Sequence, residues 1–335
     1  MSKDMRTLFA GMYGPFSSIV LERLLANNIR IAAVLLSGQS GVPLRELPWP
    51  RASALSNPGD GLELPPLLNA SVTSFPTVRE ESGVASGSSA IDAARVGELL
   101  PASVPALAFQ SGIPSYECGE IGHPEVTDWL AAMSVDVVCV ACWNRVIQAS
   151  VLDIPRHGFL NVHPSILPAY RGPYPLFWQY RAGETATGVS IHWMDAGLDT
   201  GDIAGQREIQ FEDGIRGAEA EALCALSGGA LLAEVLMKLE NGELLRTSQP
   251  AGGSYFSVPS KDDFTLDADW HPRRAFNFMR ANAEWGVPFR HESEDTVHWL
   301  ADALAWREEA TPEAAGKGRV WAPFRGGAVL AVECP

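Results

Sequence analysis

The sequence predicts an α/β fold built on a mostly parallel sheet, with a smaller β-rich region at the C-terminus. Residues 7–10 form a short apolar run, apolar residues at helical spacing follow, and residues 29–36 form a second apolar run. A strand, a helix and another strand in this order make a βαβ unit, whose two strands are parallel. Residues 135–141 are almost all apolar and rich in β-branched side chains, which is typical of a strand buried on both faces.

The remaining elements follow from the same kinds of pattern. We expect a helix at 126–133, strands at 158–163, 187–194 and 203–209, a long helix at 217–239, and a closing β-hairpin across Gly326 and Gly327. We place a domain boundary near residue 210. Residues 1–210 then form the first domain, and residues 211–335 form a helix and a smaller C-terminal domain.

The segment from about residue 37 to 104 interrupts the alternation of strands and helices. It is rich in Pro, Gly and Ser, and only residues 91–100 have a short helical pattern. A loop of this length within a compact domain is usually either functional or mobile. We interpret it as an insertion into the first domain, because the alternation resumes beyond it.

The composition excludes wholesale disorder and argues against a nucleic-acid partner. The chain has 335 residues, of which 46% are hydrophobic and 19% are charged, which is enough for a buried core. Lys and Arg number 25 against 40 Asp and Glu, so the net charge is −15. Because affinity for nucleic acids rests mainly on cationic contacts, a chain this acidic is a poor candidate for binding them.

Cysteine usage and the N-terminal sequence predict a soluble protein of a reducing, cytoplasmic compartment. Five cysteines are scattered along the chain, which is not the pattern of a disulfide framework. The N-terminus lacks the apolar stretch of a signal peptide, and no uncharged run approaches the roughly 18 residues of a membrane span. Cys139 and Cys142 have a CxxC spacing, but one pair supplies only half a zinc site, so we expect no metal.

The residues between 161 and 202 carry the clearest chemical signal. Asn161 and His163 lie two positions apart at the end of a predicted strand, so both side chains point to one face at the edge where α/β folds place their sites. An amide beside an imidazole can hold a polarised carbonyl and move a proton, and Asp199 follows in a Gly-rich turn. These residues alone leave structural roles open, because an Asn-x-His pair is more often structural and an Asp in such a turn usually forms the turn.

The spacings in this stretch resemble those of the N10-formyltetrahydrofolate-dependent formyltransferase family. The signature of that family reads Asn-x-His-x-Ser-x-Leu-Pro-x-x-Arg-Gly, then Gly-Val-[Ser/Thr]-[Ile/Leu], then an Asp-x-Gly loop. The matching residues in this chain are Asn161, His163, Ser165, Leu167, Pro168, Arg171, Gly172, 188–191 and 199–201. The resemblance covers roughly residues 1–36 and 105–285, and it implies a Rossmann-like sheet with the formyltransferase fold.

The resemblance implies transfer of a formyl group from N10-formyltetrahydrofolate to an amine, without a metal or a covalent enzyme intermediate. Asn161 and protonated His163 would donate hydrogen bonds to the formyl oxygen as it becomes negative, and Asp199 would orient and stabilise the imidazole. By the same resemblance, the folate pterin lies between the loop after 135–141 and the Asp199 loop. The matching cofactor-binding residues are Trp143, Arg145, Val146, Ile147, Leu152, Asp195, Gly197 and Gly201.

We also assign residues to binding of the acceptor. These are Gly11, Tyr13, Tyr170, Arg171 and His192. Gly11 lies in the first strand-to-helix turn, where anions often bind helix N-termini, although a plain tight turn is the more frequent role. Anchoring of the loop is the favoured alternative for Tyr170 and Arg171, and packing behind the site is an equal alternative for His192.

Charge leads us to predict a small acceptor. Residues 37–100, where related tRNA enzymes carry a basic loop, contain 4 Arg against 7 Asp and Glu, and this excess would repel a phosphate backbone. The closing segment, in contrast, resembles the small C-terminal domain of methionyl-tRNA formyltransferases. We weight the charge more and expect a small-molecule amine, such as an amino sugar or an amino-acid derivative. The alternatives are methionyl-tRNA formylation and hydrolysis of formyltetrahydrofolate, whereas the intact Asn161, His163 and Asp199 argue against a non-catalytic binding module.

Overall fold

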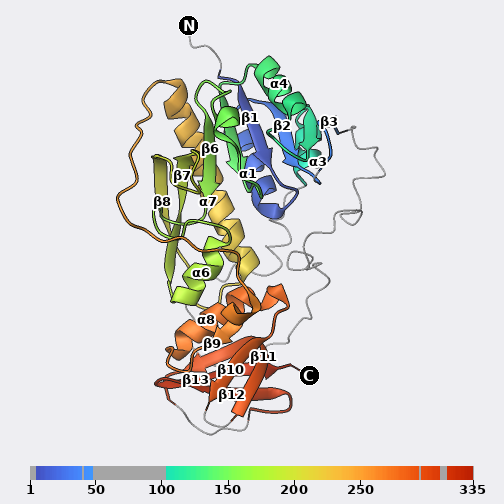
Figure 1. Cartoon of the computed structure of the whole chain (residues 1–335). Helices are drawn as coiled ribbons and strands as arrows, with labels where there is room; N and C mark the ends of the chain where they lie inside the picture. Colours follow the sequence, from blue (N-terminus) through green and yellow to red (C-terminus); the bar gives the residue numbers. More distant parts are fainter. Residues whose placement is uncertain (1–4, 40, 48–102, 294–295, 310–314, 335) are drawn as a thin grey trace.

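A computed structural model describes residues 5–39, 41–47, 103–293, 296–309 and 315–334, and Figure 1 shows the whole chain. The described elements form two sheets that lie one beyond the other, and the smaller sheet is built from the C-terminal part. The larger sheet has eight strands in the order β3-β4-β2-β1-β5-β6-β7-β8, and the smaller has five in the order β12-β13-β11-β10-β9. This arrangement confirms an α/β fold with a smaller β-rich region at the C-terminus.

The larger sheet is parallel over its five central strands. β3, β7 and β8 are antiparallel to their neighbours, whereas β4, β2, β1, β5 and β6 run parallel. The strands are β1 (Thr7–Gly11), β2 (Ile31–Ser37), β3 (Arg45–Glu46), β4 (Ser115–Cys118), β5 (Val137–Ala141), β6 (Phe159–His163), β7 (Ala186–Trp193) and β8 (Ile203–Gln210). The strand order reverses between β1 and β5, and open α/β sheets bind ligands beside the carboxyl ends of the strands at such a point.

Helices cover the two faces of this sheet unequally. The core on the first face contains residues of α1 (Pro15–Ala26), α3 (Val104–Gln110), α6 (Pro175–Ala182) and α7 (Gly217–Glu240), and it continues into the smaller sheet. On the second face, α4 (Pro124–Met133) and α5 (Ala149–Leu152) cover a smaller core that extends along the sheet only to Phe159, the first residue of β6. No described helix joins that second core beyond Phe159, so loops cover the remaining side chains of β6 and β7 there.

The longest helix, α7, packs on the larger sheet. It lies against α1, β7 and β8, and its apolar residues belong to the core on that face. By length and composition it is the one helix in the described ranges that could cross a membrane. Half of its most apolar 18-residue stretch, however, is buried inside the protein. The apolar character of α7 is therefore explained by the core. The domain boundary near residue 210 stays a prediction.

The structure adds elements that the sequence patterns did not indicate. β4 has the sequence Ser-Tyr-Glu-Cys, which has no clear apolar alternation, and it is a strand because it pairs with β2. Most of the predicted insertion at 37–104, including the helical pattern at 91–100, lies outside the described residues. Within its described part, β3 pairs with β4, and Val104 begins α3.

The smaller sheet is mostly antiparallel and is covered by α8 (Pro272–Asn282). Its strands are β9 (Thr265–Leu266), β10 (Phe289–Ser293), β11 (Thr296–Arg307), β12 (Arg319–Phe324) and β13 (Gly327–Glu333). β12 and β13 form the predicted closing hairpin, in which Phe324 pairs with Gly327 and Gly326 has a positive φ of 80°. The single turn that joins the two strands needs this glycine because other residues rarely adopt such a φ.

A buried histidine makes the smaller sheet sensitive to acid. His291 of β10 is fully buried, stacks on Phe324 with 4.5 Å between ring centroids, and pairs across the strands with His298 of β11. Burial lowers the pKa of His291, and the neighbouring His298 acts in the same direction. The full stability is therefore present above the unfolded-state pKa of about 6.5, and it is lost as the pH falls below that value, by up to about 1.4 kcal/mol per pH unit.

We expect the variant His291→Phe to lose less stability than the wild type on acidification. Phenylalanine keeps the stacking on Phe324 and carries no titrating nitrogen. Thermal unfolding of both proteins at about pH 7.5 and about pH 5.5 measures the two losses, a range in which histidine titrates. Equal losses in the two proteins would contradict a role for His291.

Candidate active site

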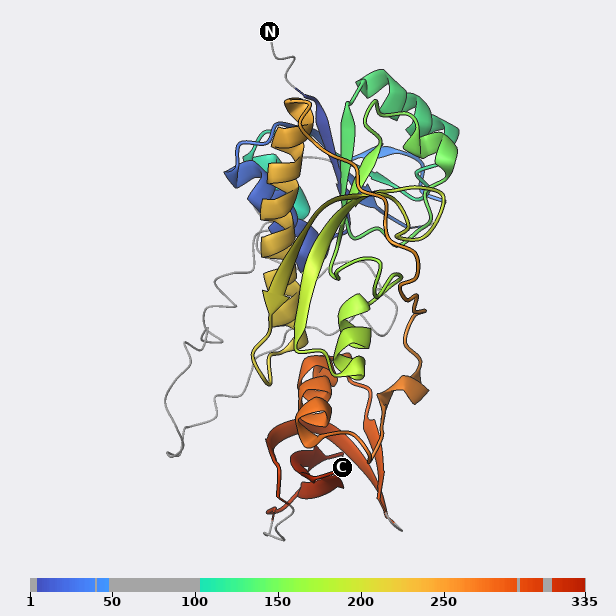
Figure 2. The ribbon, with the colours of Figure 1, turned by 90° about the vertical axis from the view of Figure 1, so that its left-hand side faces the viewer.

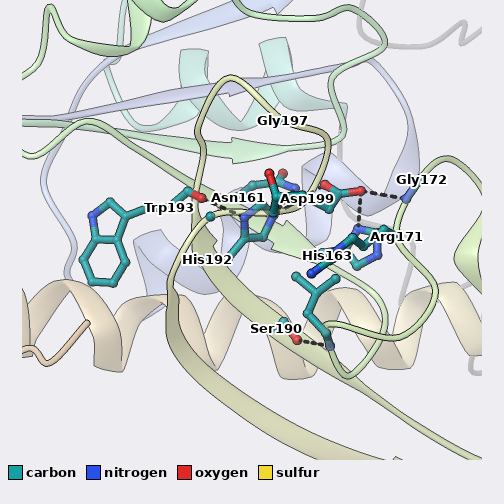
Figure 3. Close-up of polar contacts among 12 residues, drawn as sticks. Asn161, His163, Arg171, Gly172, Ser190, His192, Trp193, Gly197 and Asp199 are labelled. Carbon is teal, nitrogen blue, oxygen red and sulfur yellow. Dashed lines mark hydrogen bonds and ion pairs between the residues drawn. The ribbon is translucent and has the colours of Figure 1, made fainter. Parts of the chain in front are cut away.

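Strand alternation places Asn161 and His163 of β6 on the face of the sheet that the helices leave uncovered. Leu160 and Val162, which alternate with them on β6, point to the opposite face, into the core that contains α7. His192 of the antiparallel strand β7 lies directly opposite Asn161. Figure 3 shows these side chains beside Asp199. The period of two predicted from the sequence therefore brings the Asn and His side chains to one site.

Asp199 lies in the loop between β7 and β8 and contacts both histidines (Figure 3). Its Oδ2 atom is 3.6 Å from His163 Nδ1 and accepts a hydrogen bond of 2.8 Å from the backbone N–H of Gly172, and its Oδ1 atom is 3.5 Å from His192 Nε2. Asp199 has a positive φ of 55°, a conformation that costs energy in residues other than glycine and that concentrates at functional sites. The three predicted catalytic residues thus form one cluster with His192.

This cluster holds Asp199 in its ionised form. Burial alone would raise the pKa of Asp199, but His163, His192 and the Gly172 N–H favour the carboxylate and together lower the pKa to about 2. Burial lowers the pKa of His163, and the Asp199 carboxylate opposes that shift. Because the carboxylate stays charged at any physiological pH, it can stabilise an imidazolium whenever His163 takes up a proton.

His192 is only 2% exposed and fixes the orientation of Asn161. Its Nδ1 atom lies 2.8 Å from the carbonyl oxygen of Trp193, so Nδ1 carries the proton and donates it. In the neutral ring Nε2 accepts a hydrogen bond of 3.1 Å from the Asn161 side-chain amide, and in the protonated ring it donates toward Asp199 Oδ1, 3.5 Å away, and so favours the carboxylate. His192 therefore lies behind Asn161 and Asp199, as in the packing alternative, and its direct contact with an acceptor stays a prediction.

The second ring nitrogen of His163, Nε2, lies 2.9 Å from the carbonyl oxygen of Tyr170. Both nitrogens of His163 thus face acceptors, so the doubly protonated ring satisfies the site better than the neutral ring does. The loop that carries Tyr170 is held by Ser190 of β7, whose Oγ accepts a hydrogen bond of 3.0 Å from the Leu167 N–H and donates one of 2.7 Å to the Ser165 carbonyl. The position of the Tyr170 carbonyl is therefore set by the sheet.

Gln249 and Ser254 also hold the site, and the sequence indicated neither of them. Gln249 Nε2 donates a hydrogen bond of 2.8 Å to the carbonyl oxygen of Asp199, and Ser254 Oγ accepts one of 2.8 Å from the Tyr170 N–H. These contacts join residues 50 and 84 positions apart in the chain. The two side chains lie in a Pro- and Gly-containing stretch that looks like an ordinary linker, so no local pattern could have identified them.

The predicted cofactor residues after β5 lie in different environments. Ile147 and Leu152 are buried in the smaller core, whereas Val146 is 76% exposed. Trp143 packs against the same core, and its indole N–H is buried without a hydrogen-bond partner among the described residues. Arg145 donates to backbone carbonyl oxygens in the loops after β2 and β4 and so connects these loops. In this group, Val146 therefore offers an exposed apolar surface to a ligand, and Trp143 offers a hydrogen-bond donor.

The other predicted cofactor residues shape the Asp199 loop. Asp195 Oδ1 accepts hydrogen bonds of 3.0 Å from the Gly197 N–H and 2.7 Å from the Thr200 hydroxyl, which closes a local turn. A Cβ atom at Gly201 would lie 1.9 Å from the Trp193 carbonyl oxygen, so only glycine fits there. These contacts form the loop, and binding of a cofactor by the same residues stays a prediction.

The predicted acceptor residues fall into two groups. Tyr170 and Arg171 lie beside the catalytic cluster, where Arg171 Nη2 donates a hydrogen bond of 2.7 Å to Gln249. Gly11 ends β1 and Tyr13 follows it, and β1 is two strands away from β6, or roughly 10 Å at the usual strand spacing. The structure thus brings the first group next to Asn161 and His163, and contact of either group with an acceptor stays a prediction.

The described residues contain no group of three His, Cys, Asp or Glu side chains arranged to hold a metal ion. Cys139 is buried inside β5, and Cys142 is exposed after the strand has ended. The CxxC spacing therefore joins two cysteines in different surroundings and does not form a binding site.

Comparison with known proteins identifies the family. A family model described as formyl transferase matches residues 84–217 of this chain. A curated methionyl-tRNA formyltransferase from Chromohalobacter salexigens is 36% identical over 218 residues, which are 64% of this chain and 67% of that protein. The chain belongs to the formyltransferase family. The motif that connects Asn161, His163 and Asp199 lies within the matched region.

Other formyltransferases match a shorter part of this member of the family. A methionyl-tRNA formyltransferase from Synechococcus sp. (strain JA-3-3Ab) is 38% identical over 186 residues, or 55% of this chain. The chain spans 58% and 61% of the length of the first two curated relatives.

Solved structures of formyltransferases share the fold described above. An N-formyltransferase from Helicobacter canadensis, solved with folinic acid and dTDP-3-aminofucose, superposes with a TM-score of 0.60 over 98% of this chain and 100% of its own, at 15% identity. WlaRD, a sugar 3-N-formyltransferase solved with dTDP and 5-N-formyltetrahydrofolate, gives 0.58 over 99% and 98%, also at 15% identity. At this identity the likeness concerns the fold alone, and it confirms the predicted formyltransferase fold.

Proposed function

We propose that this formyltransferase moves a formyl group from N10-formyltetrahydrofolate to a primary amine of a small molecule. The observation that carries the proposal is the cluster of Asn161, His163 and Asp199 on the face of the sheet that loops cover, with 3.6 Å between His163 Nδ1 and Asp199 Oδ2. Acyl transfer needs hydrogen-bond donors at the carbonyl oxygen and a group that moves protons, and this cluster offers both.

The residues of the two predicted cofactor loops suit a folate. A pterin is a flat ring with an apolar face and several polar edge atoms. Val146 and Leu198, one on each loop, are exposed apolar side chains, and the buried indole N–H of Trp143 has no acceptor within the described residues. Exposed apolar side chains and an unpaired donor are what such a ring requires. The folate supplies the activated formyl carbonyl.

Asn161 and His163 act on the formyl oxygen. One amide N–H of Asn161 is held by His192, which directs the other N–H away from it, toward the reacting carbonyl. His163 donates from Nε2 to the same oxygen, in place of its present hydrogen bond to the Tyr170 carbonyl. Both donors stabilise the negative charge that grows on the oxygen as the amine attacks.

Asp199 keeps His163 charged and oriented. Its carboxylate faces Nδ1 and stays ionised, so the imidazolium can give a proton to the leaving nitrogen and then take one from the attacking amine. The contact of 3.6 Å is longer than a good hydrogen bond. Such contacts commonly shorten when the substrates bind.

Charge supports a small acceptor. Residues 265–335 contain 8 Lys and Arg against 11 Asp and Glu, so the C-terminal part carries no excess of positive charge. Within the described residues, Arg273, Arg280 and Arg290 are each paired with a carboxylate. A tRNA-binding surface needs cations that face the phosphate backbone. The negative segment at 37–100, which first suggested a small acceptor, lies mostly outside the described residues.

The second candidate is methionyl-tRNA formylation. The curated relatives that share 31–38% of their aligned residues with this chain carry that name. Hydrolysis of formyltetrahydrofolate is a third candidate, in which water replaces the amine at the same cluster.

A direct assay separates the three candidates. The 335-residue protein is incubated with N10-formyltetrahydrofolate and, in separate reactions, with a panel of nucleotide-linked amino sugars and amino acids, with initiator methionyl-tRNA, or with buffer alone. We expect mass spectrometry to detect a formylated small amine. Formylation of the tRNA and of no small amine would favour the second candidate, and folate turnover in buffer alone would favour the hydrolase.

A further inference from the structure

The segment between α7 and α8 passes along both loops that form the site. We call residues 247–257 the strap, and Figure 2 shows this part of the chain running beside the larger sheet toward α8. At its start, Thr247 exchanges backbone hydrogen bonds of 2.7 and 3.1 Å with Ile203, just after the Asp199 loop. Near its end, Arg171 donates a hydrogen bond of 2.9 Å to the Ser254 carbonyl and accepts one of 2.9 Å from the Phe256 N–H. The strap is thus bonded to both loops.

Gln249 connects the two loops through one side chain. Its Nε2 donates hydrogen bonds of 2.8 Å to the carbonyl oxygen of Asp199 and 2.8 Å to that of Gly201. Its Oε1 accepts hydrogen bonds of 2.7 and 3.2 Å from Nη2 and Nε of Arg171. The amide therefore uses both of its donors on one loop and its acceptor on the other.

These contacts act on the position of the Asp199 carboxylate. Asp199 has a positive φ, so its backbone needs outside support to keep this conformation. Its carboxylate meets His163 on one side and the N–H of Gly172, the neighbour of Arg171, on the other. Any change in the separation of the two loops would alter the distance between Asp199 and His163. Gln249 fixes that separation directly.

We propose that Gln249 is a positioning residue, which holds the Asp199 carboxylate against His163 by bonding the backbone of the Asp199 loop to Arg171. The consequence for catalysis rests on the proposed function. The positioning itself does not, because it concerns the environment of the His163 imidazole in the protein without substrates. Arg171 then acts mainly through Gln249, in line with the loop-anchoring alternative.

The variant Gln249→Met tests the proposal, because methionine has a similar length and neither donates to the carbonyls nor accepts from Arg171 as the amide does. We expect kcat to fall by about 10- to 100-fold, the effect of misplacing a catalytic group by about 1 Å, while KM for N10-formyltetrahydrofolate changes by less than about threefold. An imidazolium that loses its carboxylate has a lower pKa. The decline of kcat at alkaline pH should therefore begin at a lower pH in the variant than in the wild type. An NMR titration of His163 should likewise give a lower pKa.

Two further variants separate positioning from simple stability. Gln249→Glu keeps an acceptor for Arg171 and removes both donors to the Asp199 loop, so we expect kcat to fall although the contact that holds the strap remains. Leu245→Gln is the control. It changes a side chain that lies just before the strap and is 80% exposed, so we expect wild-type kcat. A loss confined to thermal stability, with an unchanged kcat and His163 titration, would overturn the proposal. If the wild type formylates no amine, the proposed function fails, and the His163 titration still decides whether Gln249 positions Asp199.

Discussion

Replacing Asp199 by asparagine is expected to lower kcat by about 10²- to 10⁴-fold, the largest effect we predict for a change of one atom. Asparagine has almost the same shape and can still accept the hydrogen bond from the Gly172 N–H. It carries no charge, so the His163 imidazolium loses the partner that now lies 3.6 Å from its Nδ1. Burial of His163 is then opposed only by the hydrogen bond to the Tyr170 carbonyl, so the ring stays neutral, is a weaker donor to the formyl oxygen and has no extra proton to give to the leaving nitrogen.

The comparison must separate loss of chemistry from loss of the loop. Steady-state kinetics with the amine found in the screen give kcat, and titration with tetrahydrofolate gives the affinity, which should stay within about threefold if the loops keep their shape. Asp202→Asn is the matched control, because it makes the same change in the same loop at a carboxylate outside the cluster, and its kcat should equal that of the wild type. An Asp199→Asn protein with wild-type kcat would contradict the catalytic assignment.

The parts of this site that the sequence could predict are those set by local geometry. Asn161 and His163 follow from the period of a strand, since two positions on one strand share a face wherever that strand lies. Asp199 lies only 36 positions from His163, in a turn that the family signature includes, so its place could be inferred from the resemblance. The α/β alternation could likewise be predicted from apolar runs, because buried parallel strands are uniformly apolar.

The parts that could not be predicted depend on contacts between distant segments. Gln249 has no local pattern, and its role exists only because the strap returns along the sheet to the Asp199 loop. β4 is a strand because of its partner β2 and not because of its own residues. The sequence also could not show that β5 lies between β1 and β6, which sets the spacing between Tyr13 and the catalytic cluster, and binding of an acceptor by Tyr13 stays a prediction. Sheet order is a property of the whole chain, which a single segment does not encode.

An aromatic cluster joins the larger sheet to the smaller one, and its centre is Phe177 of α6. The Phe177 ring is 3% exposed and lies 5.2 Å from Phe264, 5.3 Å from Phe278 and 5.4 Å from Trp285, measured between ring centroids. The three partners belong to the C-terminal part of the chain, and Phe278 lies on α8. The packing between α6 and α8 therefore depends on this side chain.

We expect Phe177→Ala to lower the free energy of unfolding by about 3–5 kcal/mol, the usual cost of removing a buried aromatic ring. Chemical denaturation measures the loss, and limited proteolysis shows where it acts. Because the cavity would lie between the two sheets, we expect cleavage to begin between α7 and α8. Phe177→Leu refills part of the cavity and should lose less, and Val258→Ala, an exposed truncation in the same region, should change stability by less than about 0.5 kcal/mol.

Cleavage of Phe177→Ala between α7 and α8 would show that the smaller sheet supports the catalytic loops through the strap. The strap runs beside the larger sheet, is bonded to the catalytic loops and continues toward α8 of the smaller sheet, so a smaller sheet that detaches would release the support of Asp199 as well. Phe177→Ala should then lose kcat at temperatures where the larger sheet is still folded, although Phe177 touches none of the catalytic side chains. A protein that loses about 3 kcal/mol of stability but keeps wild-type kcat below its unfolding transition would show that the strap holds the site without the smaller sheet.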